Sequence, residues 1–452
     1  MGDAYTCELW AVPENLHELT ALTKLIVTNT LFLCSSTCLR RHQAVQARIL
    51  YLHQCHELIS LPDTLGQLTA LNTLHIAGCR LLRMMPASMG QLASLTILEL
   101  ISCSSLTELP VSLGCLTALL KLHIFGCGAL TLLPESLGQL TALTTLEVIS
   151  CGLLAALPGS LDQLAALTFL NVKECRVIAG LPQSLGRLKL LQALFFMWCD
   201  RLNSLPKSLG QLTALTKLDI SDSDTLSELP ESLGQLAALT SLILYRCNML
   251  SELPESLVQL RSLRELLLAG CRALTRLPES LGQLAALTTL NMSECIAVTQ
   301  LPNTLGRLAA LTTLQLGRCY ALTQLPESLS GLTALRTLTL GHCQRLVSLP
   351  ECVGLFPALS ELDISYCTSV KRLPFSFFYF PDLFYTDIFI TLSSLVFPPH
   401  DIALQGMPVL RGFLIANHYP LKMLMLIMVA MRAKMDHLPS ELWSLMCENL
   451  SE

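Results

Sequence analysis

Cysteine is the residue of this 452-residue chain with the widest chemistry, because thiolates bind metals, act as nucleophiles and form disulfides. The chain has 19 cysteines, and Ser223 fills the one gap in a series of 13 that recur at multiples of 24 residues. The series is Cys55, Cys79, Cys103, Cys127, Cys151, Cys175, Cys199, Cys247, Cys271, Cys295, Cys319, Cys343 and Cys367. A disulfide framework has paired, irregular spacings. We therefore predict a ladder of buried, reduced thiols, with serine accepted at 223 for its hydrogen bonding, and a cytoplasmic or nuclear location.

Two groups of residues contain side chains that commonly bind metal ions. Cysteines and histidines near the N-terminus have a spacing that would place three zinc ligands on one helix face; they are Cys34, Cys38 and His42, followed by His53, Cys55 and His56. Carboxylates cluster in DISDSD at Asp219, Asp222 and Asp224, but the glycine and closing glutamate of a calcium loop are absent. A degenerate repeat and a solvated acidic rim are the favoured interpretations, so we expect no metal or other cofactor.

Catalytic motifs are absent from the sequence. It contains no GxxxxGK(S/T), GxGxxG, HExxH or GxSxG pattern. Cys447 could act as a nucleophile, but no catalytic domain surrounds it. We expect a protein that is not an enzyme and has no small-molecule substrate.

Prolines reveal the elements that position these residues. Fourteen of the 22 prolines are separated by 24 residues without insertion or deletion, from Pro62 to Pro374. One repeat, Leu133 to Ala156, reads LPESLGQLTALTTLEVISCGLLAA. Leu146 and Val148 alternate with other residues as in a short strand. PESLGQL, whose proline suits a first helical position, predicts a short turn or single helical turn on the outer face.

One repeat cannot bury its own apolar face, so neighbouring repeats must stack into a continuous core. LxxLxLxxC, from Leu143 to Cys151, is the leucine-rich-repeat signature, with cysteine where many such repeats have asparagine. We predict an α/β fold: a leucine-rich-repeat solenoid, or horseshoe, with 24-residue repeats and a parallel sheet on its concave face.

The repeats also resemble those of two particular groups. LPxSLGxLTxLxxLxLxxCxxLxxLP is similar to the repeats of plant TIR-type disease-resistance receptors and of Ras-group leucine-rich-repeat proteins. This resemblance implies repeats that recognise proteins or autoinhibit a neighbouring domain. A nucleotide-binding domain and a TIR domain are both missing from this chain, so switching by nucleotide is not implied.

Three segments follow from the pattern. We expect an N-terminal cap with degenerate repeats at 1–60, the solenoid at 61–397, and a non-repeating helical tail or cap at 398–452. The hydrophobic share of 52% comes from the leucines of the repeats, and no stretch reaches the roughly 18 apolar residues of a membrane span. The net charge of −5 offers no basic surface for nucleic acid.

The tail suggests an alternative function. LPSELWSLMCENL, from Leu438, resembles the first helix of an F-box, and a SOCS-box-like segment is equally arguable. Either would make the chain a substrate receptor, or adaptor, of a ubiquitin ligase.

Sequence variation between the repeats indicates where a partner binds. LPxSLGQLxAL is nearly constant, whereas the central outward strand position changes in charge and size, as in His75, Glu99, Phe195 and Asp219. Aromatic and arginine side chains dominate binding hot spots. We predict a non-enzymatic scaffold that binds a protein partner on its concave face, through Phe125, Phe169, Lys173, Phe195, Met197, Trp198, Asp219, Tyr245 and Arg246.

Overall fold

The computed structural model describes residues 8–9, 24–28, 48–371, 374, 376 and 387–390. The chain divides into two compact units, Met1–Ala273 and Leu274–Glu452, and each is treated by itself. The zinc candidates Cys34, Cys38 and His42, the residue Cys447, and the expected tail at 398–452 lie outside the described residues.

Unit 1 contains parallel strands that pair in chain order. From β3 to β12, each residue aligns with the residue 24 positions further on, as Glu147 does with Asn171. The strands are β1 (Glu8–Leu9), β2 (Lys24–Thr28), β3 (Ile49–His53), β4 (Thr73–Ala77), β5 (Ile97–Ile101), β6 (Lys121–Phe125), β7 (Thr145–Ile149), β8 (Phe169–Lys173), β9 (Ala193–Met197), β10 (Lys217–Asp219), β11 (Ser241–Ile243) and β12 (Glu265–Leu267).

Unit 2 repeats the arrangement with parallel strands β13 (Thr289–Asn291), β14 (Thr313–Gln315), β15 (Thr337–Thr339), β16 (Glu361–Ile364) and β17 (Asp387–Ile390). Each 24-residue repeat thus forms one coil, which confirms the predicted leucine-rich-repeat solenoid with its parallel sheet. No helix among the described residues has the length and hydropathy that a membrane span requires.

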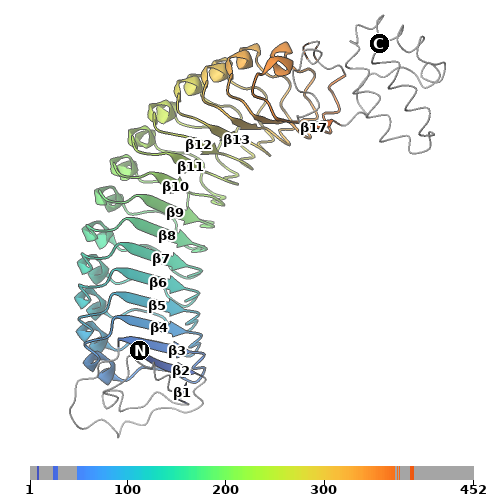
Figure 1. Ribbon diagram of the computed structural model, residues 1–452. Helices are drawn as coiled ribbons and strands as arrows, with labels where there is room; N and C mark the ends of the chain where they lie inside the picture. Colours follow the sequence, from blue (N-terminus) through green and yellow to red (C-terminus); the bar gives the residue numbers. More distant parts are fainter. Residues whose placement is uncertain are drawn as a thin grey trace, which may run out of the picture. The chain divides into compact units, whose positions relative to one another are not determined.

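Short 3₁₀ helices form the side of each coil opposite the strands (Figure 1). In unit 1 they are η2 (Asp63–Gln67), η3 (Ala87–Gln91), η4 (Val111–Cys115), η5 (Glu135–Gln139), η6 (Gly159–Gln163), η7 (Gln183–Arg187), η8 (Lys207–Gln211), η9 (Glu231–Gln235) and η10 (Glu255–Gln259). In unit 2 they are η11 (Glu279–Gln283), η12 (Asn303–Arg307), η13 (Glu327–Gly331) and η14 (Glu351–Leu355). The predicted helical turn is confirmed, but the proline precedes the first helical residue; Pro134 is extended, with φ −68° and ψ 145°.

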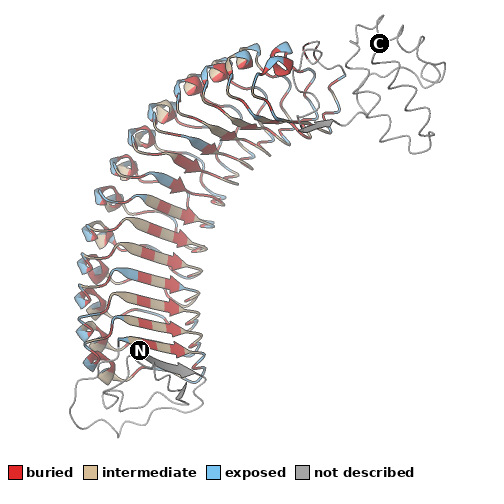
Figure 2. Cartoon of the chain, in the orientation of Figure 1, coloured by how far each residue is buried: buried red, intermediate tan, exposed pale blue. Residues whose placement is uncertain are grey.

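The core lies between the strands and the 3₁₀ helices. Along β7, Leu146 and Val148 are fully buried, whereas Thr145, Glu147 and Ile149 are partly exposed, and Figure 2 shows the same alternation in the neighbouring strands. Leucines of the 3₁₀ segment, such as Leu137, fill the core from the other side. Because every coil repeats this pattern, the core is continuous within each unit.

The predicted cysteine ladder is a row of buried free thiols. A thiol donates to a backbone carbonyl of the preceding coil in many coils; Cys271 Sγ lies 3.0 Å from Leu244 O, and Cys319 Sγ lies 3.2 Å from Met292 O. Burial raises the pKa of Cys199 to about 12, which suppresses its reactive thiolate form. The hydrogen-bonding interpretation of Ser223 is wrong, because its Oγ is buried without a partner. The Cβ–O bond of serine is shorter than the Cβ–S bond of cysteine, so the hydroxyl extends less far towards the backbone carbonyls.

A left-handed residue follows each strand from β3 to β16. The position has φ between 52° and 81° in every coil, from Gln54 to Tyr366, although glycine occupies it only at Gly78, Gly126 and Gly270. Its N–H often donates to a carbonyl of the following coil, as Trp198 N does to Ser221 O at 3.0 Å. These contacts between coils hold the backbone in a region that non-glycine residues rarely adopt.

Candidate functional site

The candidate site lies on the solvent-facing side of the sheet in unit 1. We call this surface the open face; it consists of the residues at the first, third and fifth positions of the five-residue strands and their equivalents in β10 to β12. We call the left-handed positions after the strands the rim. Backbone hydrogen bonds between coils fix the open face and the rim, so the side chains of both project from a preorganised surface.

Phe169 and Phe195 form the aromatic centre of the open face. Phe169 is the first residue of β8 and Phe195 the third of β9, and their ring centroids lie 5.3 Å apart at an interplanar angle of 42°. Lys217 Nζ, from β10, lies 5.4 Å from the Phe195 ring centroid, in a cation–π contact. Both rings are partly exposed, so they present apolar surface to solvent.

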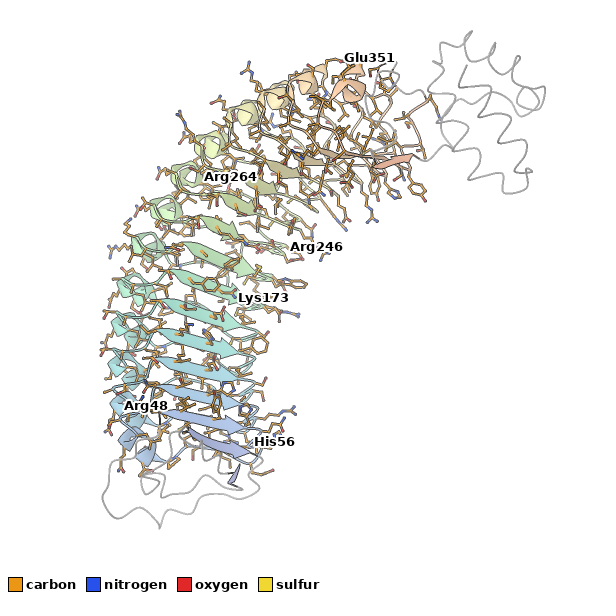
Figure 3. All side chains as sticks on the ribbon, viewed as in Figure 1. Arg48, His56, Lys173, Arg246, Arg264 and Glu351 are labelled. Atoms are coloured by element: carbon orange, nitrogen blue, oxygen red, sulfur yellow. The ribbon has the colours of Figure 1, made fainter. Side chains whose placement is uncertain are left out.

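Two of the predicted residues, Trp198 and Arg246, lie on the rim. The exposed fraction of Trp198 is 44%, and φ is 58°. Arg246, labelled in Figure 3, has φ 53° and pairs with Asp222, whose Oδ1 lies 3.6 Å from Nη1. Since both backbones are held in the left-handed region, these side chains extend from a fixed base at the edge of the sheet.

The fifth strand position brings Phe125, Lys173 and Met197 into one row. Phe125, on β6, is 44% exposed, and Ile149 separates it from Lys173. Met197 aligns directly with Lys173, which Figure 3 labels. Lys173 Nζ also lies 3.7 Å from Glu174 Oε1 on the rim. This row is apolar except for its lysine.

Asp219 and Tyr245 lie further along the sheet, on β10 and after β11. Asp219 is only 8% exposed, and its Oδ1 accepts hydrogen bonds from Ser221 N at 3.0 Å and Ser221 Oγ at 2.5 Å. Ser221 Oγ in turn lies 3.2 Å from the backbone N–H of Tyr245. The carboxylate of Asp219 therefore stabilises the backbone between coils.

The structure brings only part of the predicted set together. Phe169, Phe195, Met197 and Lys173 lie on the adjacent strands β8 and β9, with Trp198 beside them on the rim. Phe125 lies two strands before this group, and Tyr245 and Arg246 follow β11, two strands after it. The nine residues are spread over β6 to β11 rather than in one cluster.

A histidine ladder on β3 to β7 is not evident as a group from the sequence alone. His53 and His75 stack with centroids 4.8 Å apart, and His75 Nδ1 lies 2.5 Å from Glu99 Oε2. His123 Nδ1 lies 3.5 Å from Glu99 Oε1 and 3.8 Å from Glu147 Oε2. The sequence signal is the alternation of histidine and glutamate at 24-residue spacing in His75, Glu99, His123 and Glu147, because residues at that spacing lie on neighbouring strands. His53, 22 residues before His75, falls outside that spacing.

Neither described metal candidate forms a ligand set. Cys55 Sγ faces its own strand, 3.6 Å from His53 O, and His53 stacks on His75. In DISDSD, Asp219 accepts from Ser221 and Asp224 accepts from Asn248 Nδ2 at 2.7 Å. Burial raises the pKa of Asp222, despite the nearby Arg246. Among residues 48–371, no three histidine, cysteine or carboxylate side chains are arranged to hold a metal ion.

Comparison with solved structures supports the fold. A leucine-rich-repeat protein of Leptospira interrogans matches with 24% sequence identity over 75% of this chain and 95% of its own, with a TM-score of 0.51. The structure of the TLR13–ssRNA13 complex matches with 20% identity over 83% of this chain and 58% of that chain, with a TM-score of 0.56. No family model and no curated protein matches the sequence. The chain thus has the leucine-rich-repeat fold.

Proposed function

We propose that this chain is a non-enzymatic scaffold that binds a protein partner on the open face of unit 1, the concave face of the predicted solenoid. The observation that supports this most directly is the aromatic group of the partly exposed Phe169 and Phe195 and the exposed Trp198, on a backbone fixed by pairing between coils. Rigid aromatic side chains give large contact areas at a small cost in conformational entropy.

The distribution of variation between repeats supports the same surface. Buried strand positions remain leucine, isoleucine, valine, phenylalanine or methionine, whereas open-face positions include lysine, glutamate, histidine, asparagine and phenylalanine. A packing role constrains the first set, whereas the second set varies in charge and size, as a surface that contacts a partner would. The similarity to plant TIR-type and Ras-group repeats agrees with partner binding in the cytoplasm.

The test is capture of the partner from an extract of the protein's own cells, followed by its identification and a binding measurement with both proteins purified. The double variant Phe195→Ala and Trp198→Ala should weaken that affinity at least tenfold. Its unfolding free energy should fall by less than about 1 kcal/mol, since both side chains are partly exposed. An unchanged affinity would refute the proposed surface.

Two control variants make the result specific. Phe196→Ala removes a fully buried ring next to Phe195 and should cost about 3–5 kcal/mol of stability. Met84→Asp with Leu132→Asp alters exposed apolar residues outside the open face and should leave the affinity unchanged. Loss of binding in this second control, with the aromatic variant unaffected, would place the partner on the surface that carries Met84 and Leu132 instead of the open face.

A second candidate function rests on the tail. LPSELWSLMCENL, from Leu438, resembles the first F-box helix, so the solenoid would hold a substrate while the tail recruits a ubiquitin ligase. Deletion of residues 432–452 should then abolish recovery of a cullin complex and leave substrate binding intact. Recovery of the same complex by the truncated chain would exclude this function.

A further inference from the structure

The first strand position of β6 to β10 forms a symmetric row on the open face. The aligned residues are Lys121, Thr145, Phe169, Ala193 and Lys217. Phe169 lies two strands from each lysine, and small residues separate the three larger side chains. At about 4.8 Å between neighbouring strands, the lysines are about 19 Å apart and the phenylalanine lies about 10 Å from each.

Both lysines have exposed side chains. Among the described residues, the ion pairs of this part of the open face include neither Lys121 nor Lys217, and Lys217 makes a cation–π contact with Phe195. Nearby carboxylates have other donors: His123 and Asn171 lie beside Glu147, and Ser221 donates to Asp219. The row therefore presents two cations around an aromatic centre.

These spacings match one backbone conformation of a partner. A polyproline II helix has three residues per turn and rises about 3.1 Å per residue, so residues i, i+3 and i+6 lie on one side at about 9.3 Å intervals. An ideal β-strand alternates sides every residue, and would turn residue i+3 away from the sheet. Two strand spacings of about 9.6 Å thus correspond to one turn of polyproline II.

We propose that the open face binds an acidic segment in polyproline II conformation, which crosses β6 to β10 with carboxylates at i and i+6 and a large apolar side chain at i+3. The carboxylates pair with Lys121 and Lys217, and the apolar side chain packs on Phe169 and Phe195. This inference rests on the proposed function, since it specifies the chemistry of the partner at the same face.

The test uses three fluorescein-labelled peptides and the full-length protein, with fluorescence anisotropy as the measurement. PPPEPPYPPEPPP has the proposed spacing. PPPEPYPPPEPPP has the same composition with tyrosine moved by one residue, and PPPQPPYPPQPPP lacks the carboxylates. Saturable binding is expected for the first peptide, at least fivefold weaker binding for the second and at least tenfold weaker binding for the third at low salt.

Variants of the protein locate the binding. The double variant Lys121→Gln and Lys217→Gln should weaken binding of the first peptide at least tenfold and make its affinity nearly independent of salt. Phe169→Ala should weaken binding of the first and the third peptide by similar factors. Lys207→Gln, on η8 at the opposite side of the coil, is the matched control and should change no affinity.

Several outcomes would overturn the inference. Equal binding of the first two peptides would show that the spacing is irrelevant. Unchanged affinity of the double lysine variant for the first peptide would show that the two lysines are not part of the site. Tighter binding of a ten-residue oligouridylate than of the first peptide would assign the row to single-stranded nucleic acid. If the purified partner still depends on Phe195 and Trp198 while the first peptide fails to bind, the proposed function stands and this inference does not.

Discussion

At the scale of single residues, the histidine ladder shows how neighbouring strands create interactions between residues that are far apart in sequence. His53 and His75 are separated by 22 positions but stack face to face, with Tyr51 5.3 Å from the His75 ring. Burial and the proximity of His75 lower the pKa of His53. Protonation of His53 is therefore less favourable in the folded chain than in the unfolded chain.

The sign of the effect on stability follows from proton binding. A histidine whose folded pKa lies below its unfolded value binds fewer protons when the chain is folded. The unfolding free energy that His53 contributes therefore falls as the pH falls from about 6.5 towards the folded pKa. We expect NMR titration to give His53 a pKa below 6.5. His75→Gln should raise that pKa without restoring it fully, because burial remains. No change in the variant would mean that burial alone causes the shift.

At the scale of the elements, the repeat pattern predicted the strand, the helical turn and the buried leucines because each has a clear period. Strand lengths were not predictable in the same way: β3 to β9 have five residues, whereas β10 to β15 have three. The left-handed position after each strand was also hidden, since most coils place a non-glycine residue there. Its conformation depends on hydrogen bonds between coils, which no local sequence preference specifies.

Glycine substitutions test that left-handed turn. Gly126 has φ 68°, where alanine is strained, so Gly126→Ala should lower the unfolding free energy by about 1–2 kcal/mol. Gly152 has no such φ, and a Cβ there would meet nothing within 4 Å. Gly152→Ala should leave stability unchanged or raise it by up to about 1 kcal/mol. Urea unfolding of both variants measures the difference; equal losses would contradict the strain argument.

The candidate site was predictable in its residue types but only partly in its geometry. The aromatic positions were visible as departures from the repeat, and Phe169 and Phe195 do contact each other. The internal bonding of Asp219 was not visible, since it depends on the orientation of Ser221. The row from Lys121 to Lys217 was also not visible in the sequence, because it becomes apparent only when the strands are aligned in register.

At the scale of the whole molecule, the fold is a series of similar coils that contact mainly their neighbours. In such solenoids the stability is approximately the sum of the coil stabilities and the interfaces between them. A defect in one coil should therefore loosen the adjacent coils before distant ones, which differs from the all-or-none unfolding of a small globular domain.

Leu146→Ala tests this expectation. Leu146 is fully buried in β7, so its truncation should cost about 2–5 kcal/mol. Hydrogen exchange should accelerate most in β6 to β8, and β14 to β16 in unit 2 should retain their protection. Thr145→Ala, at the adjacent open-face position, is the control and should change exchange little. Equal acceleration in both units would show that the coils unfold together.

The constant 24-residue register also affects how binding specificity can change over evolutionary time. Recombination between two nearly identical repeats inserts or deletes a whole coil, and the strands on either side can still pair in the same register. Each event would change the separation between two groups on the open face by one strand spacing, about 4.8 Å. A lineage could thus select partners of different lengths by gaining or losing coils, with no new side chain required.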